Sequence, residues 1–199
     1  MSSDWTVLLV GGPAAVGKTS AAKRIATVSG ASLLQVDDVC LALQRAIDPA
    51  DSPLLHTFAS PEVWGRPVAE LVALRRELAA LVSSSLEFVV ANHLAHDDRV
   101  VLEGVWITPE FMSRTSYAES IAGDRRRAVV LFEDDPTRIR ASFSTRRGFD
   151  QRPAGYRDAR TALEVAYARW LRTQALMRKV PIVEARPVGH LAERILAVL

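Results

Sequence analysis

A run of eight residues near the start of the chain has the composition and spacing of a phosphate-binding loop. Residues 12–19 read G-x-x-x-x-G-K-T, after an apolar run at 6–10 that predicts a strand and before helix-forming residues at 20–26. Gly12 and Gly17 allow successive backbone N–H groups to turn towards an anion, and a helix that begins near Lys18 adds the positive end of its dipole. We therefore expect a nucleotide to bind here through the following residues: Gly12, Pro13, Ala14, Ala15, Val16, Gly17, Lys18, Thr19 and Ser20.

Two side chains of this run have predicted roles in phosphoryl transfer. The ammonium group of Lys18 is expected to reach the β- and γ-phosphates of ATP as a catalytic residue, and the Thr19 hydroxyl is expected to bind Mg²⁺. Glu103 ends another apolar run, at 100–102, and is a second candidate for the Mg²⁺ site, acting through a water molecule. Gly104 follows it and would let a ligand approach closely, although a solvated strand end is the alternative interpretation of Glu103.

A pair of carboxylates follows the apolar run at 32–36. Asp37 is placed to orient an acceptor hydroxyl, or to accept its proton, across from the γ-phosphate, so it is the candidate catalytic base. The alternative is that the pair caps a helix at 39–47, since Asp is a favoured capping residue. The two interpretations are compatible, because Asp38 can cap while Asp37 faces the substrate.

Arginines flank a loop that contains Gly and Pro and lies between two expected helices. We expect residues 146–155 to form a lid that brings guanidinium groups onto the phosphates and excludes water. Arg147 is the catalytic candidate, and Arg146 and Arg152 are candidates for contact with the nucleotide. An exposed basic turn is the alternative for each of the three.

The elements that must position these residues alternate between strand and helix. Five apolar runs separated by helical patterns predict an α/β fold of the P-loop NTPase class, a three-layer α/β/α sandwich with a parallel five-stranded sheet. Ligands bind at the carboxyl ends of such strands, where the loop at 12–19, Asp37 and Glu103 are all expected. We predict one domain over residues 1–199, with an acceptor-binding helical segment at about 39–98 that three serines at 83–85 divide into two helices.

Composition limits the class of protein further. The chain has 199 residues, 49% of them hydrophobic, and a formal net charge of +2, without a block of like charge that would indicate a nucleic-acid partner. Cys40 is the only cysteine, which excludes an internal disulfide and suits the cytoplasm. We expect neither a signal peptide nor a membrane-spanning stretch, and the oligomeric state cannot be read from the sequence.

The loop at 12–19, Asp37, the strand ending at Glu103 and the arginine-bearing loop together resemble small-molecule kinases of the P-loop nucleoside/nucleotide-kinase group. Residues 91–94 leading into residues 101–107 look most like 2-phosphoglycerate-kinase-like ATPases, and residues 8–38 resemble chloramphenicol-phosphotransferase-type enzymes. This resemblance implies a sheet of order 2-3-1-4-5, the use of ATP and Mg²⁺, and a lid.

The expected function is that of an ATP-dependent kinase, which transfers the γ-phosphoryl group to a hydroxyl of a small-molecule acceptor. The alternative is a P-loop ATPase or a nucleotide-binding regulatory protein without such activity. The N-K-x-D and D-x-x-G motifs of regulatory GTPases and the L-S-G-G-Q stretch of transport ATPases do not occur in the sequence. The long segment between Asp37 and the run at 100–102 favours the kinase, because it would build an acceptor pocket.

Overall fold

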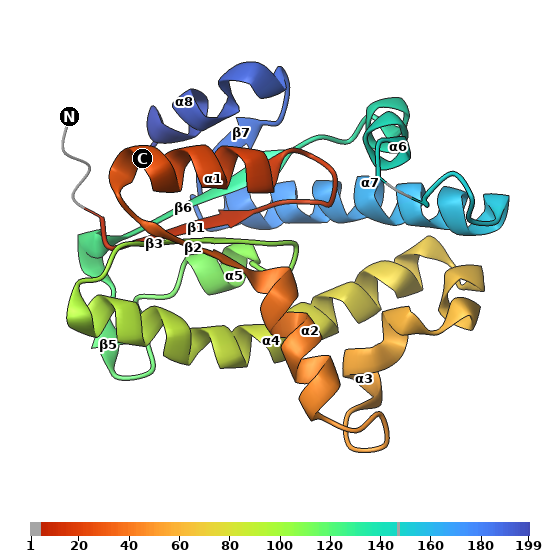
Figure 1. The fold of residues 1–199 in the computed structure, drawn as a ribbon, viewed down its shortest axis with the longest axis horizontal. Helices are drawn as coiled ribbons and strands as arrows, with labels where there is room; N and C mark the ends of the chain where they lie inside the picture. The colour runs from red at the N-terminus through yellow and green to blue at the C-terminus, as the bar shows by residue number, and fades with distance from the viewer. Residues whose placement is uncertain (1–4, 147) are drawn as a thin grey trace.

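Five apolar runs of the chain become the five strands of one parallel sheet in the computed structural model, which describes residues 5–146 and 148–199. The strands are β1 (Val7–Gly11), β2 (Ser32–Gln35), β3 (Val100–Glu103), β6 (Arg126–Phe132) and β7 (Ile182–Glu184). Their order is β2-β3-β1-β6-β7, so the predicted order 2-3-1-4-5 is confirmed for the strands of this sheet (Figure 1). The numbering differs because a short antiparallel hairpin, β4 (Ser116–Tyr117) and β5 (Ser120–Ile121), precedes β6, and two-residue strands are too short to show a periodic pattern.

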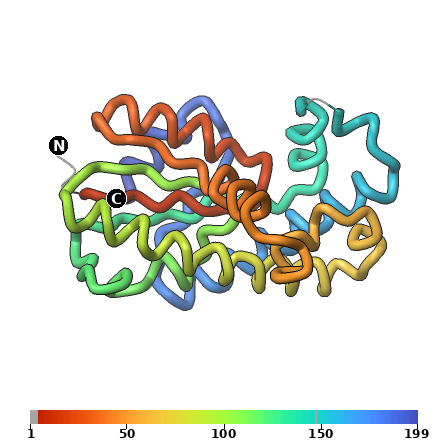
Figure 2. Tube along the Cα trace, turned by 60° about the horizontal axis from the view of Figure 1, so that its bottom comes forward, coloured from red at the N-terminus to blue at the C-terminus, as the bar shows by residue number. Residues whose placement is uncertain are grey.

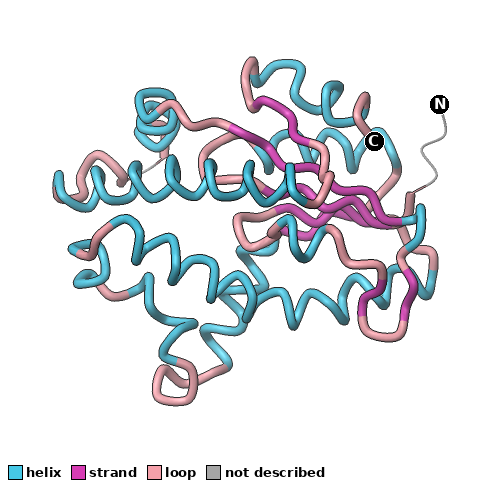
Figure 3. The backbone as a smooth tube through the Cα atoms, turned by 180° about the vertical axis from the view of Figure 1, so that it is seen from behind, coloured by secondary structure: helices cyan, strands magenta, loops and turns pink. Residues whose placement is uncertain are grey.

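Strand β1 shows why the runs are apolar throughout. It lies between β3 and β6, with Leu9 in register with Leu102 on one side and Ala128 on the other, and all its residues are buried. Successive side chains of a strand point to opposite faces. Leu9 accordingly joins the core beneath α4 (Val68–His96) and α7 (Ala154–Met177), and Leu8 joins the core beneath α1 (Lys18–Ser29) and α8 (Leu191–Leu196). The predicted three-layer sandwich is confirmed, with helices on both faces of the strands (Figure 3).

The segment between β2 and β3 is helical throughout most of its length. It contains α2 (Val36–Ala46), α3 (Pro53–His56), the 3₁₀ turns at Thr57–Ala59 and Pro61–Gly65, and then α4. Figure 2 shows α4, coloured yellow to green, running along the length of the molecule. The predicted break at residues 83–85 is wrong, because α4 continues through the serines, with Ser83 buried and the Ser84 hydroxyl donating to the carbonyl of Leu81 at 2.7 Å.

The uninterrupted α4 also corrects the expectation that no stretch approaches a membrane span. Among the described residues, α4 is the one helix long and apolar enough, by length and composition, to cross a membrane. Core helices of folded domains pass the same test. Here Leu78, Val82, Leu86 and Val90 of α4 are buried in the core between this helix and the sheet.

The remaining helices connect the later strands. They are α5 (Pro109–Met112) before the hairpin, α6 (Pro136–Ser144) after β6, and α7, followed by β7, a 3₁₀ turn at Val188–His190 and α8. Asp135 caps α6, since its carboxylate accepts the N–H of Thr137 at 2.8 Å and that of Arg138 at 3.3 Å. Helix α7 follows the loop after α6 and packs against α4 and β6.

Candidate active site

The glycine-rich loop leaves the carboxyl end of β1 and enters α1 at Lys18, as the sequence pattern predicts. Gly12 has φ +141°, and a Cβ there would lie 2.7 Å from the carbonyl oxygen of Leu131, so only glycine fits between β1 and β6. Gly17, with φ +92°, precedes α1, and no side chain in the described part of the chain caps that helix. The positive end of α1 is thus available to an anion.

Lys18 folds back across the loop. Its ammonium group donates to the carbonyl of Pro13 at 2.6 Å, and the side chain is buried. Burial lowers the pKa of Lys18, and the nearby carboxylates of Glu103 and Asp37 act in the opposite direction. The residue therefore lies near acidic side chains that favour its charged form.

The two predicted Mg²⁺ ligands contact each other. The Thr19 hydroxyl donates to a carboxylate oxygen of Glu103 at 2.7 Å, and Glu103 is buried, which contradicts its interpretation as a solvated strand end. No group of three or more His, Cys, Asp or Glu side chains that could hold a metal occurs among residues 5–146 and 148–199. Mg²⁺ keeps several waters and needs only one or two protein oxygens beside substrate phosphates, so a threonine–glutamate pair of this kind fits the ion.

Gly104 has a different role from the one predicted. A Cβ at this position would lie 2.8 Å from Cβ of Val36, the first residue of α2. The glycine therefore admits the start of α2 against the end of β3, and its small size is explained by packing and not by the approach of a ligand.

Asp37 and Asp38 lie inside the first turn of α2, which begins at Val36, before both of them. The residue at the capping position is Gln35, so the interpretation of the pair as a helix cap is wrong. Their charges lie at the positive end of α2, where they stabilise the helix. Both are exposed, but of the two it is Asp37 that lines the cavity beside the phosphate-binding loop.

That cavity has a volume of about 280 Å³ and brings together six of the residues predicted from the sequence, which are Ala14, Lys18, Thr19, Asp37, Glu103 and Arg146. Lys18 and Thr19 come from the loop and α1, Asp37 from α2, and Glu103 from the end of β3. Three arginines and two aromatic side chains also line it, namely Arg75, Arg146, Arg160, Phe58 and Trp106. Ser20 is also predicted to bind the nucleotide, but it is exposed and is not among the described residues that line this cavity.

The predicted lid arginines fall in different places. Arg146 lines the same cavity and also a second one of about 610 Å³, with which the first shares Phe58 and Arg160. Arg152 lines only the second cavity, and its guanidinium group lies 5.6 Å from the ring centre of Tyr156. Arg147 lies outside the described residues. The closing movement of residues 146–155 therefore stays a prediction.

Sequence reasoning missed a buried carboxylate in the middle of α7. Glu164 has no exposed surface, and one of its oxygens accepts the N–H of Ala14, in the phosphate-binding loop, at 2.7 Å. Its other oxygen lies 3.2 Å from Nη2 of Arg75, on α4, and 3.3 Å from Nη2 of Arg160. Only the four-residue spacing of Arg160 and Glu164 along α7 is visible in the sequence, and many exposed pairs share it.

Glu164 should make the stability of the protein depend on pH. Burial alone would raise the pKa of Glu164, but Arg75, Arg160 and the Ala14 N–H lower it from 4.5 to about 2. The carboxylate therefore stabilises the folded state fully above pH 4.5, and this contribution is lost as the pH falls towards 2. We expect Glu164→Gln to lower the free energy of unfolding at pH 7 by about 3 kcal/mol, as the shift implies.

Urea unfolding of this variant and of the unaltered protein at pH 7 and pH 3 would test the prediction. The difference in the free energy of unfolding between the two proteins should be smaller at pH 3 than at pH 7. Glu70→Gln, at an exposed position of α4, is the control and should change little at either pH. A Glu164→Gln variant as stable as the unaltered protein at pH 7 would contradict the assignment.

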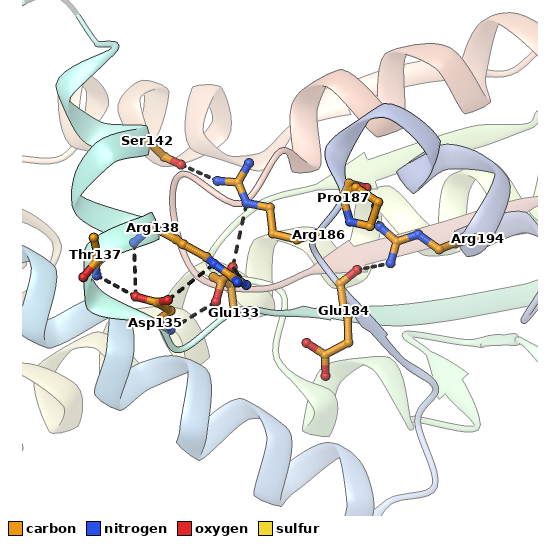
Figure 4. A network of polar contacts seen from close by, with 9 residues as sticks. All are labelled: Glu133, Asp135, Thr137, Arg138, Ser142, Glu184, Arg186, Pro187 and Arg194. Atoms are coloured by element: carbon orange, nitrogen blue, oxygen red, sulfur yellow. Dashed lines mark hydrogen bonds and ion pairs between the residues drawn. The ribbon is translucent and has the colours of Figure 1, made fainter.

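A further cavity, of about 800 Å³, lies between α6 and the segment that follows β7. Arg186 joins the two, since its Nη2 donates to the Ser142 hydroxyl at 2.5 Å and its Nε lies 3.7 Å from a carboxylate oxygen of buried Glu133 (Figure 4). Val188, in the same wall, lies 3.4 Å from the position that a Cβ on Gly17 would take. This cavity therefore adjoins the end of the phosphate-binding loop.

Comparison with known proteins identifies the class of fold. No family model matches the chain, and no curated protein matches it. A gluconokinase from Sinorhizobium meliloti 1021 matches with a TM-score of 0.52 at 17% identity, over 98% of this chain and 91% of that one. A protein from Chloroflexus aurantiacus J-10-fl to which a kinase activity has been ascribed matches with a TM-score of 0.54 at 14% identity, over 98% and 97% of the two chains. The chain thus has the α/β fold of P-loop small-molecule kinases.

Proposed function

We propose that the protein is an ATP-dependent kinase of the cytoplasm that transfers the γ-phosphoryl group to a hydroxyl of a small molecule. The observation that carries the proposal is the cavity in which Lys18, the Thr19–Glu103 pair and Asp37 meet. These are a phosphate-binding cation, a pair suited to Mg²⁺ and a carboxylate for the acceptor, which are the parts that phosphoryl transfer requires. The fold agrees with this function, and the comparisons with known proteins favour neither the phosphoglycerate-kinase-like nor the phenicol-type acceptor.

ATP would lie along the loop with its base in the cavity between α6 and the segment after β7. That cavity adjoins Gly17, the end of the loop, and the hydrogen bond from Arg186 to Ser142 links its two walls. The γ-phosphate would then point towards the cavity that contains Asp37. Thr19 and Glu103 would hold Mg²⁺, which neutralises charge on the β- and γ-phosphate oxygens when bound.

The chain's own residues would act on the acceptor as follows. Asp37 accepts the proton of the acceptor hydroxyl as its oxygen bonds to the γ-phosphorus. The bond from that phosphorus to the β,γ-bridging oxygen breaks, and its electrons leave with ADP. Lys18 stabilises the charge that develops on the transferred group and on the leaving oxygen, and Arg146 is placed in the cavity wall to do the same.

A screen for phosphate transfer tests the proposal. The protein would be incubated with γ-labelled ATP, Mg²⁺ and pools of phosphorylated sugars, glycerates, nucleosides and hydroxylated antibiotics. Label in a small-molecule product supports the kinase. ATP hydrolysis that no small molecule changes but nucleic acid stimulates would favour the alternative, a P-loop ATPase without kinase activity.

The loop between α6 and α7 should respond to both substrates. Arg146 already lines the acceptor cavity, whereas Arg152 lines only the outer one, so closure would have to move the outer part of the loop. We expect backbone amides in residues 146–155 to exchange hydrogen more slowly when a non-hydrolysable ATP analogue and the acceptor are both bound. Exchange measured by mass spectrometry that stays unchanged with both ligands present would contradict a lid.

A further inference from the structure

Arg75 is a buried cation with hydrogen-bonding capacity that the protein does not use. Its side chain is 1% exposed on α4, yet it lines the cavity that contains Asp37. Nη2 faces Glu164 at 3.2 Å, but Nε and Nη1 have no hydrogen-bond partner anywhere in the described chain. Buried donors without a partner are costly, and native proteins retain few of them without a functional reason.

Aromatic rings surround the guanidinium group but cannot satisfy these donors. Its central carbon lies 5.1 Å from the ring centre of Phe58, 5.2 Å from that of Trp106 and 5.4 Å from that of Tyr167. Such contacts stabilise the charge. The N–H groups of a guanidinium, however, lie in its own plane and need acceptor atoms there. The rings therefore hold the group in position and leave its free donors for something else.

Positive side chains outnumber carboxylates around the cavity, where Lys18, Arg75, Arg146 and Arg160 face Asp37, Glu103 and the buried Glu164. Glu164 divides its two oxygens among Arg75, Arg160 and the Ala14 N–H, so one carboxylate serves two guanidinium groups. Arg146 in the same wall adds a further positive charge. The two carboxylates that line the cavity, Asp37 and Glu103, are already assigned to the acceptor hydroxyl and to Mg²⁺ in the proposed function.

We propose that Arg75, assisted by Arg160, binds a compact oxyanion of the phosphoryl acceptor. The acceptor is then a small molecule that carries a carboxylate or phosphate beside the hydroxyl that Asp37 orients, and not a neutral alcohol. The planar fork of arginine matches both oxyanions. A volume of about 280 Å³ is at the lower end for ligand pockets, which limits the acceptor to a small molecule. This inference rests on the proposed function, because it identifies the class of substrate for the same site.

Calorimetric titration of the full chain tests the inference without requiring phosphate transfer. A saturating non-hydrolysable ATP analogue with Mg²⁺ would first fill the phosphate-binding loop. Inorganic phosphate, glycerate and glycerol would then be titrated in separate runs. We expect one equivalent of phosphate or glycerate to bind and glycerol not to bind, and the tighter of the two anions indicates whether the natural acceptor carries a phosphate or a carboxylate.

Variants of Arg75 supply the decisive comparison. Arg75→Lys keeps the positive charge and loses the planar set of N–H donors. We expect it to weaken anion binding about 10- to 100-fold, the range for hydrogen bonds to a charged group. Arg76→Met is the matched control, because Arg76 is the exposed neighbour on α4 and lines a different cavity, so anion binding should not change. If Arg75→Lys does not fold, Arg160→Lys replaces it, with a smaller loss expected because Arg160 is more exposed.

The outcomes separate this inference from the proposed function. Phosphate transfer to neutral alcohols alone, with no anion bound beside the ATP analogue, would overturn the inference and leave the kinase intact. Equal anion binding by the unaltered protein and Arg75→Lys would also overturn it. Anion binding that depends on Arg75, together with no transfer to any compound, would support the anion site and contradict the proposed function.

Discussion

Replacing Lys18 with alanine should reduce ATP turnover by about 10²- to 10³-fold, the usual effect of removing one preorganised group that stabilises transition-state charge. The ammonium group is held in the loop by the carbonyl of Pro13, at 2.6 Å, and lies within the influence of Glu103 and Asp37. In the proposed function, this cation would stabilise the negative charge of the transferred phosphoryl group. Basal hydrolysis of ATP, with water as acceptor, provides a readout that does not depend on the identity of the acceptor.

The same variant should remain folded. Burial of the Lys18 ammonium is unfavourable, as the lowered pKa shows, so its removal costs the folded state little. Lys18→Met, which keeps most of the side-chain volume, distinguishes loss of charge from creation of a cavity. Lys23→Ala, at an exposed position of α1, is the control and should retain full activity. Full turnover by Lys18→Ala would remove the basis for a nucleotide site at residues 12–20.

The elements that the sequence predicted well are those specified by local pattern. The loop at 12–19 needs particular backbone conformations at Gly12 and Gly17, and only a glycine at each position allows them without strain. Likewise, the continuous apolar runs of β1 and β3 can be buried only in a sheet covered on both faces. In each case the requirement lies within a few residues along the chain, so spacing alone reveals it.

The features that the sequence did not reveal depend on contacts between distant segments. The pairing of Arg75 with Glu164 joins residues 89 positions apart, and it forms because α4 packs against α7. The start of α2 at Val36, earlier than predicted, places that residue against Gly104 at the end of β3. An apolar β-branched residue after a strand otherwise predicts that the strand continues. Tertiary packing therefore overrides the local preference of Val36 for a strand.

Asp37→Asn should reduce phosphate transfer by about 10²- to 10⁴-fold, the range for general acid–base groups, with little change in ATP affinity. The substitution keeps the shape of the side chain and removes the negative charge that is proposed to accept the hydroxyl proton. Asp37 lines the cavity with Lys18 and Thr19, so its carboxylate is on the side of α2 that faces the phosphate-binding loop. Transfer kinetics and the affinity for an ATP analogue, measured separately, distinguish a role towards the acceptor from a role in nucleotide binding.

Asp38→Asn is the matched control, since Asp38 is the adjacent residue in the first turn of α2 and is also exposed. It should lose only part of the favourable interaction with the helix dipole, about 0.3–1 kcal/mol of stability, and keep its activity. If Asp38→Asn loses phosphate transfer and Asp37→Asn retains it, then Asp38 and not Asp37 is the residue that orients the acceptor. If both variants transfer phosphate at the normal rate, neither carboxylate orients the acceptor, and the base must be sought elsewhere in the cavity wall.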